Sequence, residues 1–271
     1  MEKRSILNRT GPSDGCICIY QPLQIFPMMQ EPLVFALGRI ENLVHQVSLD
    51  AKKGTGRVIT NRSLVARDDL HEALEIFKDA IDSGLAVSPL VRLEDVGERF
   101  MIHTVCSMTI DGYLIKHGIP VRPKGGGLIE VIDRETVRFT DIIMYWATTI
   151  DPLDLLIAQE LTGICEMMRT GTGRILGNLH EAPMIAHDTI EDLLDELRDA
   201  GIMGVIELGD PNMDVLGMPV ERDHLGVALI GGTNPAAAAV EFGLDIETAS
   251  ISGLTEISEM CHIDELIDRM L

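Results

Sequence analysis

The feature that most constrains this chain is a pattern of residues that occurs twice in the same order. Gly54-Thr55-Gly56-Arg57 recurs 117 residues later as Gly171-Thr172-Gly173-Arg174, and Asn61 falls on Asn178 at the same offset. Further matches follow in order, pairing 82–84 with 199–201, Gly118 with Gly243, and 127–131 with 253–257. The offset grows to 125 at Gly243, so the second copy carries an insertion. Five ordered matches predict an internal duplication.

Each copy predicts the same series of elements. A strand leads to an amphipathic helix, then to two strands, a second helix and a last apolar strand. The expected segments are 57–64, 70–81, 85–93, 101–106, a helix ending near 118, and 127–131; in copy two they are 174–178, 190–197, 202–208, 226–230, a helix ending near 243, and 253–257. This βαββαβ order is that of ferredoxin-like sandwiches. We therefore expect an α+β fold of two tandem ferredoxin-like repeats related by a pseudo-twofold axis, with Val58 and Ile175 in equivalent strands.

The duplication also predicts the division of the chain. Residues 1–33 belong to neither copy, and four prolines there break any long helix, which indicates an irregular N-terminal arm. We expect the first repeat at 34–138, a connection at 139–152 and the second repeat at 153–271. Each repeat is preceded by an extra helix, at about 36–52 and 153–168, because apolar residues recur there at helical spacing.

Composition and charge exclude several classes of protein. The apolar share of 46% and the charged share of 24% are those of a globular chain. No apolar run is long enough to span a bilayer, and the first ten residues have no signal-peptide core, so a cytoplasmic protein without membrane contact is expected. The net charge is −21; residues 151–271 hold 24 acids and only 5 bases. Such a surface repels DNA, so any effect on transcription is expected to act through a partner.

The reactive residue types form no recognisable centre. The five cysteines are odd in number and scattered, which argues against a disulfide framework, and neither Cys16-Ile17-Cys18 nor any pair of histidines has metal-ligand spacing. Cys106 has no base beside it in sequence, so an inert buried thiol is favoured over a nucleophile. We expect no metal, no cofactor and no catalytic residue.

Two kinds of turn could hold an anion. In each copy the third strand runs into a helix, through Cys106–Thr109 or Gly231–Pro235, and the free N–H groups of a helix N-terminus attract anions. Simple helix capping is the alternative. Residues 120–127 combine two cations with three glycines, which could enclose a carboxylate or could be a glycine-rich bend. The candidate residues are Cys106, Ser107, Thr109, Arg122, Lys124, Thr233 and Asn234.

Several longer stretches resemble one known family. They are Gly56–Asn61, Ala80–Ser88, Thr104–Gly112, His117–Val121, Pro152–Asp154, Gly209–Asn212 and Gly231–Pro235. Together they resemble the NrpR regulatory domain, the effector-sensing module of archaeal nitrogen-regulation repressors, over about 34–271. The resemblance implies a homodimeric, non-enzymatic sensor of 2-oxoglutarate that represses nitrogen-assimilation genes.

The same resemblance raises the question of DNA contact. Family members often carry an N-terminal winged helix, and residues 1–33 are too short for one. We therefore expect a repressor or co-repressor that works with a DNA-binding paralogue or basal transcription factors and does not bind nucleic acid itself. The alternative is a small-molecule enzyme that holds a carboxylate or phosphorylated substrate at the glycine-rich turns. It would need a positioned acid–base pair, which the sequence does not indicate.

Overall fold

The computed structural model describes residues 34–270, and its elements follow the duplicated order. The first copy contains α1 (Ala36–Val44), β1 (Arg57–Ala66), α2 (Leu70–Asp82), β2 (Leu90–Asp95), β3 (Arg99–Val105), α3 (Met108–Lys116) and β4 (Arg122–Ile132). The second contains α4 (Pro152–Ala158), α5 (Ile164–Thr170), β6 (Gly173–Pro183), α6 (His187–Asp199), β7 (Val205–Leu208), β8 (His224–Ile230), α7 (Asn234–Glu241) and β9 (Ile246–Glu256). Val58 and Ile175 lie in the equivalent strands β1 and β6, which confirms the duplication.

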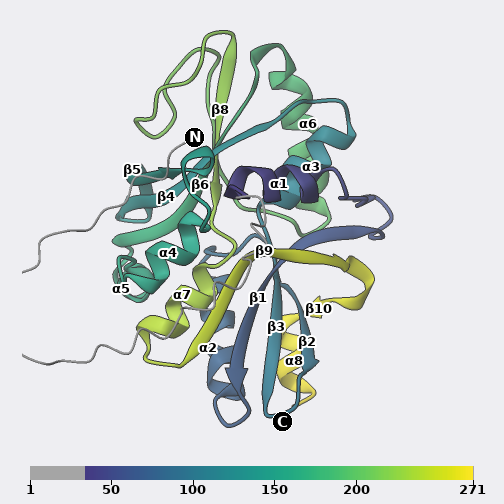
Figure 1. Cartoon of the computed structure of the whole chain (residues 1–271), viewed down its shortest axis with the longest axis vertical. Helices are drawn as coiled ribbons and strands as arrows, with labels where there is room; N and C mark the ends of the chain where they lie inside the picture. The colour runs from purple at the N-terminus through teal and green to yellow at the C-terminus, as the bar shows by residue number, and fades with distance from the viewer. Residues whose placement is uncertain (1–33, 271) are drawn as a thin grey trace, which may run out of the picture. The chain divides into compact units, whose positions relative to one another are not determined.

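The strands form two five-stranded antiparallel sheets (Figure 1). Sheet 1 has the order β10-β2-β3-β1-β9 and sheet 2 the order β5-β4-β6-β8-β7, where β5 is Glu135–Met144 and β10 is Cys261–His262. Four neighbouring strands of sheet 1, in the order β2-β3-β1-β9, correspond to four of sheet 2, in the order β7-β8-β6-β4. In each set the first strand of a βαββαβ unit lies between the third and the last, as in ferredoxin-like sheets. The α+β class and the tandem ferredoxin-like repeats are therefore confirmed.

The two copies exchange their last helix and strand, which the sequence did not reveal. β4 of the first copy pairs with β6 of the second, and β9 of the second pairs with β1 of the first. The helices move with their strands: α7 packs against α2 beside sheet 1, and α3 packs against α6 beside sheet 2 (Figure 1). We call the half around sheet 1 lobe 1 and the half around sheet 2 lobe 2. Each lobe therefore contains elements of both copies.

Some expected boundaries differ from the structure. β5 covers part of the expected connection at 139–152, and it pairs with β4 through a hairpin whose turn residues Asp133 and Arg134 have positive φ. The expected leading helix at 36–52 ends at Val44, and the one at 153–168 is divided into α4 and α5 by Glu160, at φ 52°, and by Gly163. The third difference is β2, which begins at Leu90 and not at residue 85. The N-terminal arm, with Cys16 and Cys18, lies outside the described residues.

Candidate functional site

The exchange brings two predicted turns together. The turn from β3 to α3 and the turn from β8 to α7 cross where the chain passes between lobes; we call this point the crossover. The Thr104 hydroxyl donates to the Gly232 carbonyl at 3.3 Å. A Cβ at Gly232 would lie 2.8 Å from the Val105 carbonyl oxygen and 3.1 Å from the Cys106 Cα. Only a residue without a side chain fits such a close backbone approach.

Two of the predicted anion-binding residues brace the crossover symmetrically. The Thr109 hydroxyl accepts from Ile59 N–H at 3.0 Å and donates to the Ile59 carbonyl at 3.2 Å. At the equivalent place, the Asn234 carboxamide accepts from Leu176 N–H at 2.8 Å and donates to the Leu176 carbonyl at 3.1 Å. All four residues are buried. Thr109 and Asn234 therefore provide acceptors for the Ile59 and Leu176 N–H groups, and they add a second donor to carbonyls that already accept from Cys106 N–H and Gly231 N–H.

A buried polar network fills the space between the two turns. The equivalent asparagines of the duplicated motif take part on both sides: Asn178 Nδ2 donates to Ser107 Oγ at 2.8 Å, and Asn61 Oδ1 accepts from Ile251 N–H at 3.1 Å. The Tyr145 hydroxyl donates to Asn178 Oδ1 at 2.6 Å, and burial raises the pKa of this tyrosine well above its ordinary value. Ser107, at the turn that opens α3, therefore takes part in this buried network.

The crossover encloses very little free space. Its cavity measures about 10 Å³, which is room for about one water molecule. It is lined by Asn61, Cys106, Ser107, Met108, Tyr145, Asp151, Leu153, Asn178, Gly232, Ser250 and Ile251. Burial raises the pKa of Cys106 to about 12, so its sulfur stays a thiol and not a nucleophilic thiolate. The nearby Thr233 hydroxyl is buried and has no hydrogen-bond partner among the described residues.

Two aspartates at the start of α4 adjoin this cavity. Asp151 is 4% exposed and accepts from Leu153 N–H at 2.9 Å, as a helix N-cap. Burial and the neighbouring carboxylate of Asp154 raise the pKa of Asp151 to about 7. Asp154 in turn accepts from both the backbone N–H and the hydroxyl of Ser250. The crossover therefore carries a carboxyl group that titrates near neutral pH.

Asp151 should make the stability of the protein fall between pH 4 and pH 8. The folded protein holds this proton more tightly than the unfolded chain, so the stabilisation is complete below about pH 4 and is lost as the pH rises through about 7. The slope is at most about 1.4 kcal/mol per pH unit. We expect Asp151→Asn to flatten the dependence of the unfolding free energy on pH, measured by urea denaturation, whereas Asp141→Asn on exposed β5 should not. Parallel curves for Asp151→Asn and the wild type would contradict the assignment.

The predicted cations lie elsewhere. Lys124 Nζ forms ion pairs with Glu181 at 3.1 Å and Glu221 at 2.6 Å, and Arg122 lies 3.5 Å from Glu221. The sequence argument joined them to Ser107 because both segments flank α3. That helix has nine residues and is therefore about 13 Å long, so its two ends are far apart. No described contact links Arg122 or Lys124 to the crossover.

The two cations instead border a separate groove. It has a volume of about 680 Å³ and is lined by Leu37, Glu41, Val44, His45, Ile115, Pro120, Val121, Arg122, Pro123, Lys124 and Trp146. Trp146 is 63% exposed. The size is that of a small-molecule site, but both cations already face acidic partners.

Sequence reasoning missed several residues of the crossover. Asn61 and Asn178 carried a usable signal, because the duplication preserved both at one offset. Tyr145, Asp151 and Ser250 lie outside the matched motifs and reach the crossover only through the exchange.

Away from the crossover, one group of side chains at the surface could offer metal ligands. The ligand atoms of His187, Asp188 and Glu191 on α6 lie within 4.8 Å of one another. Within residues 34–270, no helix has the length and apolar character to cross a membrane.

Comparison with known proteins gives a consistent result. The family model of the NrpR regulatory domains NRD1 and 2 matches residues 33–262. The global nitrogen regulator NrpRI of Methanosarcina mazei is 33% identical over 237 residues, 84% of this chain and 73% of that protein. The global nitrogen regulator NrpR of Methanococcus maripaludis is 29% identical over 230 residues. The matched region is 85% of this chain but only 40% of that longer protein.

A solved structure agrees with the fold. The crystal structure of a nitrogen repressor-like protein from Methanococcus jannaschii has a TM-score of 0.76 and 27% identity, over 86% of this chain and 100% of that one. The duplicated fold and these relatives define the class of the protein, the regulatory domains of nitrogen regulators. The chain belongs to the family of NrpR regulatory domains, and the resemblance seen in the sequence is confirmed.

Proposed function

We propose that this chain is a non-enzymatic sensor of 2-oxoglutarate that represses or co-represses nitrogen-assimilation genes as a cytoplasmic homodimer. The excess of 19 negative charges in residues 151–271 opposes direct contact with nucleic acid. The protein would therefore reach its genes through a DNA-binding paralogue or basal transcription factors. Its relatives are named global nitrogen regulators, which supports the regulatory part of the proposal.

The observation that carries the effector site is the meeting of two equivalent helix N-termini at the crossover. α3 and α7 both begin there, and their first N–H groups and positive dipole ends favour a carboxylate. Ser107, Asn178 and the Thr233 hydroxyl, which has no hydrogen-bond partner among the described residues, supply further donors. A five-carbon dicarboxylate does not fit into about 10 Å³, so its entry requires the two turns to separate. Separation of the turns would change how lobe 1 is held against lobe 2, and this is how binding would reach a partner.

Calorimetry with 2-oxoglutarate tests this placement. Loss of one buried hydrogen bond to a carboxylate is expected to cost about 1.5–3 kcal/mol, so Ser107→Ala should weaken binding about tenfold or more. Ser258→Ala, an exposed serine, is the matched control and should bind as the wild type does.

Lys124→Ala distinguishes the crossover from the groove. If Lys124→Ala weakens binding and Ser107→Ala does not, the effector binds in the groove beside Trp146. If neither variant changes the affinity, neither Ser107 nor Lys124 contacts the effector, and the Thr233–Asn234 turn on the α7 side of the crossover is the next to be tested. Absence of any binding heat for the wild type would contradict 2-oxoglutarate as the effector.

A further inference from the structure

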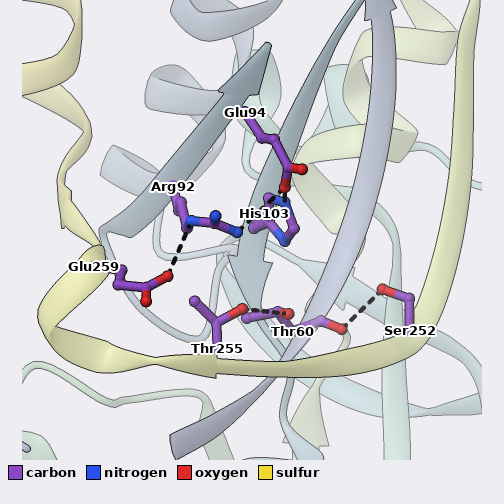
Figure 2. Close-up of polar contacts among 7 residues, drawn as sticks. All are labelled: Thr60, Arg92, Glu94, His103, Ser252, Thr255 and Glu259. Carbon is purple, nitrogen blue, oxygen red and sulfur yellow. Dashed lines mark hydrogen bonds and ion pairs between the residues drawn. The ribbon is translucent and has the colours of Figure 1, made fainter. Parts of the chain in front are cut away.

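One face of sheet 1 carries a row of basic side chains. Arg92 of β2 is directly opposite His103 of β3, which is directly opposite Arg62 of β1. Figure 2 shows Arg92, Glu94 and His103 close together on this face. In a chain of net charge −21, this places an arginine on each side of a histidine on one face of sheet 1.

The equivalent face of sheet 2 is built differently. Leu179 and Ala228 replace Arg62 and His103, and Glu207 replaces Arg92. The segment of the second copy that contains its insertion covers this face: Val215 and Val220 lie next to Gly226, and the Leu216 carbonyl accepts from Phe139 N–H. The first copy has no such segment. Among residues 34–270, no equivalent segment lies over the row of sheet 1, although His103 itself is buried.

The acidic side chains near this row already contact Arg92, His103 or Arg99. Glu94 contacts Arg92 at 3.2 Å and His103 Nε2 at 3.1 Å, and Glu259 contacts Arg92 at 3.3 Å (Figure 2). Glu247, on the neighbouring strand β9, pairs with Arg99. Among the described residues, none of these carboxylates forms an ion pair with Arg62.

Arg62 and His103 are left with buried groups that lack partners. The Nε of Arg62 and the Nδ1 of His103 are both buried without a hydrogen bond in the described part of the chain, and His103 is 1% exposed. The guanidinium of Arg62 lies against Gly253, where a Cβ would come within 2.9 Å of Nη2. A water molecule could satisfy these hydrogen bonds but not the charge. A half-buried arginine without a counter-charge is costly, and native proteins normally pair such groups.

We propose that this face of sheet 1 binds a small anion with a carboxylate or phosphate group, held by Arg62 and by His103. Because the Nε2–H of His103 already faces the Glu94 carboxylate, Nδ1 donates to the anion only when the ring takes up a second proton. The planar guanidinium offers two parallel N–H donors to such oxygens. The site is separate from the crossover: Arg62 and Asn61 are successive residues of β1, so their side chains point to opposite faces of the sheet. It does not depend on the proposed effector site.

Thermal unfolding of the full chain tests the proposal. Inorganic phosphate and succinate are titrated in separate series against chloride at equal ionic strength. At a concentration of about 100 Kd, the bound anion should raise the Tm of the wild type by about 5–10 °C. Arg62→Met should lose this shift, whereas Arg57→Met, which removes an exposed arginine of the same strand, should keep it. The series that gives the shift identifies the anion as phosphate or carboxylate.

The imidazole of His103 gives a second measurement on the wild-type protein. Burial and the guanidiniums of Arg92 and Arg62 hold the pKa of His103 below its ordinary value, while Glu94 opposes them. A bound anion should raise that pKa, as followed by nitrogen shifts of the ring in NMR. The proposal is overturned if Arg62→Met and the wild type respond alike, or if neither anion changes the Tm or the His103 titration of the wild type. Ser107→Ala should keep the whole response, so failure here and failure of the effector site are distinguishable.

Discussion

Gly232→Ala should destabilise the protein by about 2–3 kcal/mol, the upper part of the range for an inserted methyl group. The new Cβ would lie 2.6 Å from Asn61 Nδ2, 2.8 Å from the Val105 carbonyl oxygen and 3.1 Å from the Cys106 Cα. Two of these three atoms belong to the backbone of the crossing turn and cannot rotate away. In a chain of this size the corresponding fall in Tm is about 5–10 °C, which calorimetry would measure.

Gly38→Ala is the matched control for this substitution. Gly38 lies in α1, and among residues 34–270 a Cβ there would meet only Val34 Cγ1, at 4.0 Å. Replacing an exposed helical glycine by alanine stabilises by about 0.5–1 kcal/mol. If Gly232→Ala were as stable as the wild type, the two turns would not approach as closely as described.

The second large effect concerns a buried pair that joins elements of the two copies. Oδ2 of Asp111 on α3 lies 2.8 Å from Nδ1 of His180 on β6, at ion-pair distance but without hydrogen-bond geometry, and the two side chains are 1% and 0% exposed. Removal of one partner leaves the other buried and uncompensated. We expect Asp111→Ala to lower the free energy of unfolding by about 3–5 kcal/mol, measured by urea denaturation.

An exposed pair of the same residue types provides the comparison. Asp188 lies 3.4 Å from His187 Nδ1 with a fully exposed carboxylate, so Asp188→Ala should leave the urea midpoint unchanged. The double variant Asp111→Leu/His180→Leu should be more stable than Asp111→Ala, because apolar groups of similar size need no partner. Equal midpoints for Asp111→Ala and Asp188→Ala would mean that α3 is not held to sheet 2 through this pair.

The duplication could be predicted from the sequence because equivalent residues of the two copies have the same structural role. Asn61 and Asn178 both serve the crossover, and the helix-opening turns were correctly expected at Cys106 and Gly231. The exchange could not be read, since β4 meets an apolar strand of the same pattern in either arrangement. Whether its neighbour is β1 or β6 depends on the direction in which the chain leaves the turn at Cys106, and no residue type signals that direction.

The candidate site was predicted only in part for a related reason. Ser107 lies in the polar centre, but Lys124 follows the far end of α3 and pairs with Glu181 and Glu221. Proximity in sequence was a poor guide across a helix of this length. Asp151 and Ser250 escaped notice because the exchanged strand β9 brings Ser250 to the start of α4, across about 96 residues of chain.

The exchange also determines when this protein can fold during its synthesis. β1 needs β9 as its neighbour, and their contacts join residues about 190 positions apart. While the ribosome is still making the second copy, the edge of β1 that β9 will cover is open, and its unpaired N–H and C=O groups can pair with other nascent chains. The β1 edge is covered only after the segment through Glu256 has emerged, and sheet 1 is complete only after β10 has followed. The first copy therefore cannot mature ahead of the second, and a ribosome that stalls between them leaves an aggregation-prone half.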